Sequence, residues 1–308
     1  MSYPVSTSIH LFFDHSGQVP LNDQIKRHID AGFRYLDFNF LDWQNLKNAP
    51  FVGPHWRDWI QRAGEFAHEM GATFNQAHGP VPCLDCAHDL ALYRELCIRA
   101  FEGCAILGIP WMVFHNTFDP QQYGSSLSPM AFNIQFFREL LPYAHRYQVG
   151  IAIENQWPIR RLDGSAYCTV EDQIELIDAI DDPLVGACWD TGHGNLTGNG
   201  ENCKSNSRPE LLQYSDQYQN ITKLGHRLKA LHINDNNGHD DDHIAPFGGI
   251  IRWRDVLRAL DDIHYSHSFT FEAHNAVKRL PECMRDEAAA RLHQIGVYLV
   301  NMDRTAAD

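Results

Sequence analysis

Short runs of β-branched and aromatic residues recur along the whole chain, and longer segments with helical periodicity separate them. Such short apolar runs predict strands. The eight predicted strands lie at about 5–12, 35–40, 72–78, 111–116, 149–155, 185–191, 228–235 and 268–274. Strands that alternate with helices favour parallel pairing, and eight is the number that closes a (β/α)8 TIM barrel.

The segments between the strands repeat apolar residues at the spacing of an amphipathic helix. Gly71 and Gly108 stand where a left-handed residue would end a helix, and Asp23 or Ser128 is expected to cap a helix start. The clearest helical segments lie at about 55–71, 92–108, 131–147, 169–180, 253–263 and 284–301.

No Ser/Gly linker, charge block or low-complexity stretch divides the chain, so residues 1–308 are expected to form a single domain. A (β/α)8 barrel of roughly this length is ordinary. The longest irregular stretch, about 192–220, is rich in Asn, Gly and Ser and follows a predicted strand directly. A lid over the barrel mouth is therefore expected there.

Composition limits the classes of partner. The 308 residues are 44% apolar and carry a formal net charge of −14, so the surface repels polyanions and no nucleic acid is expected. No apolar run reaches the roughly 18 residues of a membrane span, and the N-terminal segment lacks a basic region before its short apolar run. We therefore expect a cytoplasmic protein, and a homo-oligomer is an open alternative to a monomer.

The eight cysteines are expected to be reduced, because a core of this size needs no disulfides. Cys83, Cys86 and His88 resemble half of a zinc knuckle, but no second pair completes it and we interpret them as loop residues. Gly248-Gly249 is interpreted as a tight turn. No glycine-rich phosphate fingerprint occurs, so no nucleotide cofactor is expected.

Imidazoles and carboxylates gather at the carboxyl ends of the predicted strands. In a parallel barrel these ends open on one face, so residues far apart in sequence converge on one mouth. The candidates, in chain order, are His78, His115, Glu154, Asp190, His193, His232, Asp241, His243 and Glu272.

A mixture of imidazole and carboxylate without thiolate suits a divalent metal ion, with Mn²⁺ or Zn²⁺ favoured over Co²⁺, Fe²⁺ or Mg²⁺. A lone His at a strand end is more often a hydrogen-bonded core residue than a metal ligand. Glu154 in IAIEN and Glu272 in FTFEAH are different, because a buried carboxylate without a cation or a proton costs several kcal/mol.

The segments IENQW, ACWDTGH, LHINDNNGHDDDH with APFGGIIRW, and FEAH resemble the xylose isomerase-like barrel superfamily, specifically its sugar phosphate isomerase/epimerase group. The resemblance spans nearly the whole chain. It implies that Glu154, Asp190, His232 and Glu272 hold one divalent ion and that His193 faces the oxygens of a sugar or polyol substrate.

The same superfamily includes the related apurinic endonuclease family 2, whose enzymes hold three zinc ions. The resemblance places their additional ligands at His78, His115, His193, Asp241 and His243. Related sugar enzymes share the Asp-x-His motif, and the loops after the third, fourth and sixth strands are poor in Lys and Arg. A DNA enzyme should carry basic docking loops, so phosphodiester cleavage is the alternative and not the first expectation.

One departure from the ketohexose epimerases concerns substrate contacts: the segment after the seventh strand, HINDNNGHDD, lacks the Arg that these enzymes usually carry. Arg252 and Arg254 follow later and could belong to the next helix. Because basic residues are scarce around the expected mouth, an unphosphorylated sugar or polyol is favoured.

The expected chemistry is isomerisation or epimerisation by proton transfer beside a carbonyl, through an enediolate. Glu154 and Glu272 would exchange protons from opposite faces, and His193 would donate to a substrate oxygen. A lyase or dehydratase acting on a keto-sugar or oxidised glycoside would need the same groups. Aromatic residues near strand ends could form a wall for the sugar ring or could simply be core: Phe12, Phe38, Trp43, Trp157 and Trp189.

Overall fold

A computed structural model describes residues 3–14, 16, 19–44, 49–81, 89–116, 120–157, 159–160, 166–196 and 215–304. Its central element is an eight-stranded parallel sheet whose order follows the chain. The strands are β1 Val5–Ser8, β2 Tyr35–Asn39, β3 Thr73–His78, β4 Trp111–Phe114, β5 Gly150–Glu154, β8 Val185–Asp190, β9 Leu228–His232 and β10 Phe269–Phe271.

Hydrogen bonds between β9 and β10 close the sheet on itself. The Ile233 amide donates to Thr270 O at 2.8 Å, and the Glu272 amide donates to Ile233 O at 3.0 Å. Ile233 and Phe271 form a parallel bridge at the same point. The expected (β/α)8 TIM barrel is therefore confirmed.

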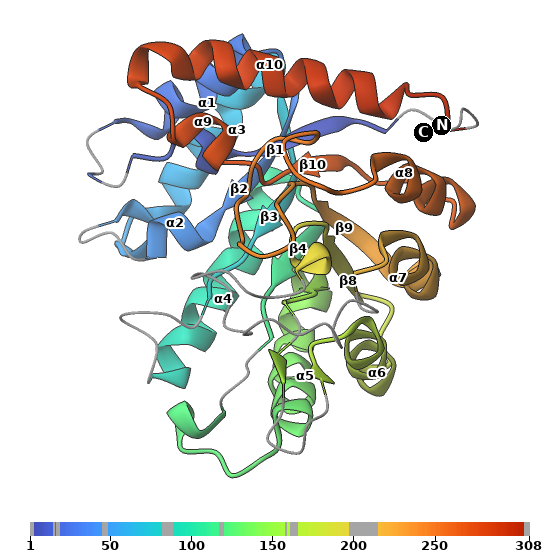
Figure 1. Cartoon of the computed structure of the whole chain (residues 1–308). Coiled ribbons are helices and arrows are strands. Elements are labelled where there is room, and N and C mark those ends of the chain that lie inside the picture. The colour runs from blue at the N-terminus through green and yellow to red at the C-terminus, as the bar shows by residue number, and fades with distance from the viewer. Residues whose placement is uncertain are drawn as a thin grey trace.

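Helices surround the barrel, as Figure 1 shows, and the long helix α10 packs against α1, α8 and α9. Among the described residues, no helix is both long enough and apolar enough to cross a membrane. The helices are α1 Leu21–Asp30, α2 Phe40–Gln44, α3 Trp56–Glu69, α4 Leu90–Leu107, α5 Pro129–Tyr147, α6 Val170–Ile180, α7 Gln217–Leu224, α8 Trp253–Asp262, α9 Asn275–Lys278 and α10 Glu282–Val300.

Helix ends follow local chemistry at most of the expected positions. Ser128 caps α5 by accepting from the Ala131 amide at 3.3 Å, and Gly71 and Gly108 follow α3 and α4 with φ of +77° and +71°. The prediction for Asp23 is wrong. Helix α1 begins at Leu21 after Pro20, which places Asp23 inside the first turn, where its charge suits the helix dipole.

Several predicted strands end earlier in the structure. The first becomes a 3-10 turn at Ile9–Phe12, because the Ser8 hydroxyl accepts from the His10 amide and turns the chain across the barrel mouth. The shorter β10 leaves Glu272 just beyond a strand end, as β4 leaves His115.

Some expectations fall partly or wholly outside the described residues. The irregular stretch 192–220 contains a 3-10 turn at His193–Asn195 and the start of α7, while residues 197–214 are not described, so the lid stays a prediction. Cys83, Cys86 and His88 also lie outside the described residues. The cysteines within them, five in number, are free thiols, as expected.

Candidate metal centre

All nine residues singled out at the strand ends lie at the same mouth of the barrel, as predicted. They form three groups in which one donor atom from each residue lies within 4.8 Å of the others. We call these the first cluster (His78, His115, Glu154), the central cluster (Glu154, Asp190, His232, Glu272) and the outer cluster (His193, Asp241, His243). Glu154 belongs to two clusters.

The first cluster joins the ends of β3, β4 and β5. Nε2 of His78 and Nε2 of His115 lie 3.1 Å apart, and Glu154 Oε2 lies 2.8 Å from His115 Nε2 and 3.8 Å from His78 Nε2. The buried Glu154 Oε2 has no hydrogen bond of good geometry within the described part of the chain. Three donor atoms thus face one another across a space that suits a cation.

The central cluster joins the ends of β5, β8, β9 and β10. His232 Nδ1 lies 2.9 Å from Glu154 Oε1 and 3.3 Å from Glu272 Oε2. Asp190 and His232 are direct partners in the parallel pairing of β8 with β9, which places them side by side. Glu154, Asp190 and His232 are each at most 1% exposed and the Glu272 side chain is 12% exposed, so three carboxyl groups share a site with little solvent.

The outer cluster lies on the turn after β8 and the loop after β9. Asp241 Oδ2 is 3.4 Å from His193 Nε2 and 3.2 Å from His243 Nε2. The other oxygen of Asp241, Oδ1, is buried and accepts no hydrogen bond from any described residue.

Backbone carbonyls orient three of the imidazoles. Nδ1 of His78 contacts Gly79 O at 2.8 Å, Nδ1 of His193 contacts Asn155 O at 3.0 Å, and Nδ1 of His243 contacts Glu272 O at 2.9 Å. Because a carbonyl only accepts, each Nδ1 carries the hydrogen. In the neutral ring this leaves the Nε2 lone pair directed into the cluster, which is the usual arrangement of metal-binding histidines.

Burial and the neighbouring charges shift the pKa values of the cluster residues, often in opposite directions. Burial, together with the Glu154 and Asp190 carboxylates, raises the pKa of Glu272 to about 8, against the opposing effect of His232 and His243. Burial lowers the pKa of His78 to about 3, with help from His115. Burial also disfavours ionised Glu154, yet the surrounding imidazoles hold its pKa well below the usual range.

The donors therefore fit divalent ions. Concentrated buried carboxylates need protons or cations for compensation, and His78 stays neutral at physiological pH, as a ligand must. Neither donor type nor spacing selects one metal.

Asparagine side chains fix the backbone and carboxylate of Asp190. Asn155 accepts from the Asp190 amide at 2.6 Å and donates to Asp190 O at 2.9 Å, while Asn234 donates to Asp190 Oδ2 at 2.8 Å. In the sequence, Asn155 directly follows Glu154 in the segment IEN, and Asn234 lies two residues after His232 in the segment HIND. Their positions in the sequence gave no sign of these contacts, so sequence reasoning assigned them no role.

Asp235 organises the loop that carries Asp241 and His243. Its buried carboxylate accepts from the amides of Asn236, Phe247 and Ile251 at 2.9, 3.0 and 3.2 Å, and from the Trp253 indole at 3.1 Å. Sequence reasoning missed this role also.

The same loop contains the predicted glycine turn. The Gly248 amide donates to Ala245 O at 3.0 Å, which confirms the turn. A Cβ on Gly249 would lie 2.1 Å from Asn236 O, so the second glycine permits a close backbone approach. Arg252 directly precedes α8 and Arg254 lies within it, as the alternative interpretation of these arginines expected.

Only one of the five aromatic candidates contacts the clusters. The Trp157 ring meets the His193 ring edge-on with centroids 5.2 Å apart. The other four pack away from the clusters. Phe38 and Trp189 do so because neighbouring strand residues point to opposite faces, whereas Phe12 lies in the 3-10 turn after β1 and Trp43 lies in α2. Their partners are His28 for Phe12, Trp59 for Phe38 and Trp43, and Gln217 for Trp189.

Two relatives share sequence with the chain. A Methanocaldococcus jannaschii protein, MJ1311, is 29% identical over 203 residues, which cover 64% of this chain and 64% of that protein. The Sinorhizobium fredii protein y4fM is 26% identical over 300 residues, covering 91% of this chain and 88% of that protein. Both are described only as uncharacterized proteins.

Solved structures with the same fold include two sugar epimerases. A D-psicose 3-epimerase crystallised in the presence of D-fructose has a TM-score of 0.70 at 13% identity, covering 98% of this chain and 100% of that one. An E. coli 3-keto-D-glucoside 4-epimerase has a TM-score of 0.65 at 16% identity, covering 95% and 99%. The family model for the xylose isomerase-like TIM barrel matches residues 25–294. The chain therefore belongs to the xylose isomerase-like TIM barrel family.

Proposed function

We propose that the protein is a divalent-metal-dependent sugar isomerase or epimerase that works by proton transfer beside a carbonyl, through an enediolate. The observation that carries the proposal is the central cluster: three carboxyl groups and one imidazole converge at a barrel mouth, with proton-accepting groups among them. The fold shared with two sugar epimerases supports this choice.

Glu154, Asp190, His232 and Glu272 would hold one ion. When bound, such an ion polarises a carbonyl and so makes the neighbouring carbon-bound proton easier to remove. The preference for Mn²⁺ or Zn²⁺ over Co²⁺, Fe²⁺ and Mg²⁺ is part of the proposal, and the mixed oxygen and nitrogen donors are compatible with either ion.

The two glutamates would exchange the substrate proton from opposite faces. They come from strands on different sides of His232, whose Nδ1 lies within 3.3 Å of a carboxylate oxygen from each. An ion bound in the central cluster would keep the Glu272 carboxylate deprotonated, and a carboxylate in that form can accept a carbon-bound proton.

His193 would donate from Nε2 of its doubly protonated ring to a substrate oxygen on which negative charge develops, because Asp190 and Asp241, against burial, raise its pKa well above the usual range. Its Nε2 lies beside Asp241 at the mouth, and the Trp157 ring meets its imidazole edge-on. Trp157 would then supply an apolar surface for the sugar, and an unphosphorylated sugar or polyol remains our preferred substrate.

Exchange with solvent tests this proposal. The metal-loaded protein is incubated in heavy water with D-fructose, D-psicose and 3-keto-D-glucosides, and carbon-bound deuterium is measured in substrate and product. We expect deuterium next to the carbonyl, accompanied by a new isomer. Glu272→Gln should abolish incorporation, whereas Glu282→Gln, on the surface of α10 and away from the clusters, should not.

The products separate isomerase from lyase chemistry. Deuterated isomers support the proposal, whereas a product that has lost a β-substituent would assign the protein to the lyases or dehydratases instead. No exchange into any sugar, in protein with a full complement of metal, would contradict the proposal.

A second candidate function is phosphoester hydrolysis. The first and outer clusters favour it, since an isomerase that holds a single ion leaves His78, His115, Asp241 and His243 without a role as ligands. The net charge of −14 argues against docking on a polyanion. Nicking of a duplex containing an abasic site by the zinc-loaded protein would favour this candidate, and hydrolysis that Glu154→Gln eliminates would exclude a contaminating nuclease.

A further inference from the structure

A second group of ionisable side chains lies at the barrel mouth. Two of them follow β1 and β2, the strands that supply no candidate metal ligand, and the third follows β10. His10 follows β1, Asp42 lies in α2 after β2, and Lys278 ends α9 after β10. His10 Nδ1 lies 2.5 Å from Asp42 Oδ1, and His10 Nε2 lies 2.6 Å from Lys278 Nζ. The three side chains form one continuous hydrogen-bonded row.

The direction of the hydrogen bonds follows from the chemistry of the end groups. The Asp42 carboxylate accepts, so His10 Nδ1 carries a hydrogen, and Nε2 of the neutral ring accepts one hydrogen from Lys278. The Lys278 ammonium makes one hydrogen bond within the described part of the chain. It therefore keeps hydrogens to donate elsewhere.

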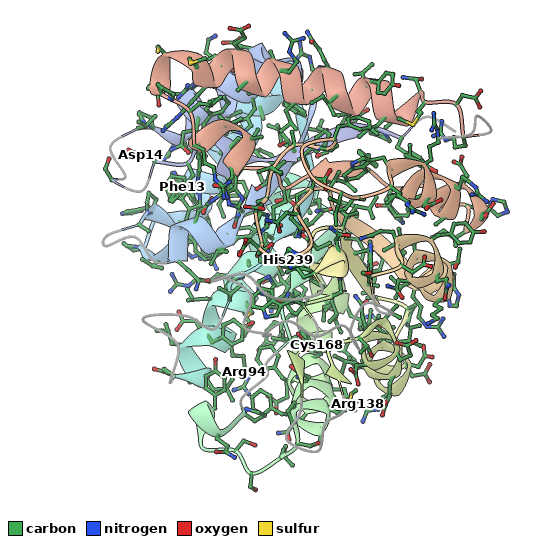
Figure 2. The ribbon with its side chains drawn as sticks, viewed as in Figure 1. Phe13, Asp14, Arg94, Arg138, Cys168 and His239 are labelled. Atoms are coloured by element: carbon green, nitrogen blue, oxygen red, sulfur yellow. The ribbon has the colours of Figure 1, made fainter. Side chains whose placement is uncertain are left out.

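Aromatic packing holds the amine in place. Lys278 Nζ lies 5.7 Å from the centroid of the Phe13 ring, and Phe13 packs against Trp43 of α2 with centroids 5.3 Å apart. Figure 2 shows Phe13 between α9 and α2. A partly buried amine beside an aromatic face and a fixed imidazole is a suitable partner for a sugar oxygen.

His274 connects this row to the outer cluster. Its ring meets His10 edge-on, with centroids 4.6 Å apart, and stacks on His243, with centroids 4.5 Å apart. Nδ1 of His274 is buried and has no hydrogen-bond partner among the described residues. The row and the clusters therefore belong to one continuous wall, with an unused polar atom between them.

We propose that Lys278 is a further acid–base residue of the proposed reaction, which contacts the substrate on the β1 and β2 side of the mouth, and that His10 and Asp42 position it. The inference rests on the proposed function for its substrate. The ammonium donates a proton to a substrate oxygen and becomes an amine. On the return step the amine takes back a proton from that oxygen or from solvent, so no co-reactant is consumed.

Charge balance indicates the kind of oxygen that Lys278 meets. One ammonium and one carboxylate, joined by a neutral imidazole, leave the row without net charge. That balance suits a hydroxyl or carbonyl oxygen of a neutral sugar better than a phosphate dianion, which would require an excess of positive charge.

The groups that surround the amine place its titration near neutral pH. Burial lowers the pKa of Lys278 to about 8; Asp42 opposes this effect and Arg285 of α10 adds to it. His10 and His274 are the other titratable groups that face it, from the turn after β1 and the residue before α9.

The test follows acetylation of individual lysines in the metal-loaded, full-length protein. Trace acetic anhydride labels the protein with and without D-fructose or D-psicose, and peptide mass spectrometry reports each lysine. At a sugar concentration of ten times Kd, we expect labelling of Lys278 to slow about tenfold. Labelling of the exposed Lys26 and Lys223, which pair with Asp30 and Glu171, should stay unchanged.

Kinetics of the deuterium exchange supply a second readout. Lys278→Met should lower kcat by about a hundredfold or more. Because Asp42 raises the pKa of Lys278, Asp42→Asn should move the alkaline limb of the pH profile to lower pH. A purely structural role for Asp42 would lower activity without moving that limb.

The outcomes separate this inference from the proposed function. Exchange without protection of Lys278, and with full activity in Lys278→Met, would overturn the inference and leave the isomerase proposal intact. Protection of Lys278 by a sugar, in metal-loaded protein that exchanges deuterium into none of the sugars, would support the substrate contact and contradict the isomerase proposal. Protection is measured on the unaltered protein, so poor folding of a variant cannot decide the result.

Discussion

The side-chain amide of Asn234 donates a hydrogen bond of 2.8 Å to Asp190 Oδ2, although the two residues are 44 positions apart in the chain. The other Asp190 oxygen accepts from the His193 amide at 2.6 Å. Both carboxylate oxygens are thus held by neighbouring strand ends, which fixes the direction in which their remaining lone pairs point.

Asn234→Ala should weaken binding of a divalent ion because Asp190 loses its orienting donor. Loss of such a partner typically costs about 10- to 100-fold in metal affinity. Isothermal titration with Mn²⁺ or Zn²⁺ measures the change, with Asn237→Ala on the exposed part of the same loop as the control. Equal affinity in both variants would show that Asn234 does not support the site.

Asp235→Ala should destabilise the protein and disorder the loop that carries the outer cluster. The substitution leaves three backbone amides and one indole without their acceptor. Each unsatisfied buried donor costs about 1–3 kcal/mol, so a decrease of at least about 3 kcal/mol in the free energy of unfolding is expected.

Urea unfolding of the metal-free protein measures this change without any contribution from bound ions. Asp240→Ala, in the same loop but outside the Asp235 network, provides the matched control. A loss of less than about 1 kcal/mol in Asp235→Ala would mean that water replaces the carboxylate.

Metal binding should release protons at pH 7. Without an ion, the raised pKa of about 8 keeps most of the Glu272 carboxyl protonated at that pH, and the Asp241 carboxylate, against burial, raises the pKa of His243 to about 10. An ion binds only the deprotonated forms, so affinity should rise as the pH rises from 6 to 8. Above the pKa of Glu272 its contribution should level off.

Calorimetry in two buffers of different ionisation enthalpy gives the number of protons released. Glu272→Gln should release fewer protons than the unaltered protein. If the apparent binding enthalpy did not depend on the buffer, the groups would already be deprotonated in the ion-free state.

The barrel could be predicted from sequence because its strands are short apolar runs separated by amphipathic segments. The convergence of nine residues followed from one rule, that all carboxyl ends of a parallel barrel share a face. The rule places a residue at the mouth but does not give its partner. Sequence alone therefore could not divide the nine into three clusters or show that Glu154 belongs to two of them.

Residues that act through hydrogen bonds escaped prediction for a physical reason. Asn234 and Asp235 carry polar side chains of ordinary loop composition, and their roles depend on amides and oxygens brought near only by folding. The possible sugar-facing wall of aromatic residues was wrong for a different reason. Phe38 and Trp189 point away from the barrel axis, and a shift of one position along a strand reverses the face that a side chain occupies.

The central claim is that buried carboxylates at the barrel mouth are compensated by divalent ions. Glu154 tests it most directly because it serves both the first and the central cluster. After dialysis against Mn²⁺ or Zn²⁺ and removal of free ion, elemental analysis should find at least one tightly bound ion per chain in the unaltered protein and a clear loss in Glu154→Gln. An unaltered protein that folds normally and retains no ion would contradict the claim.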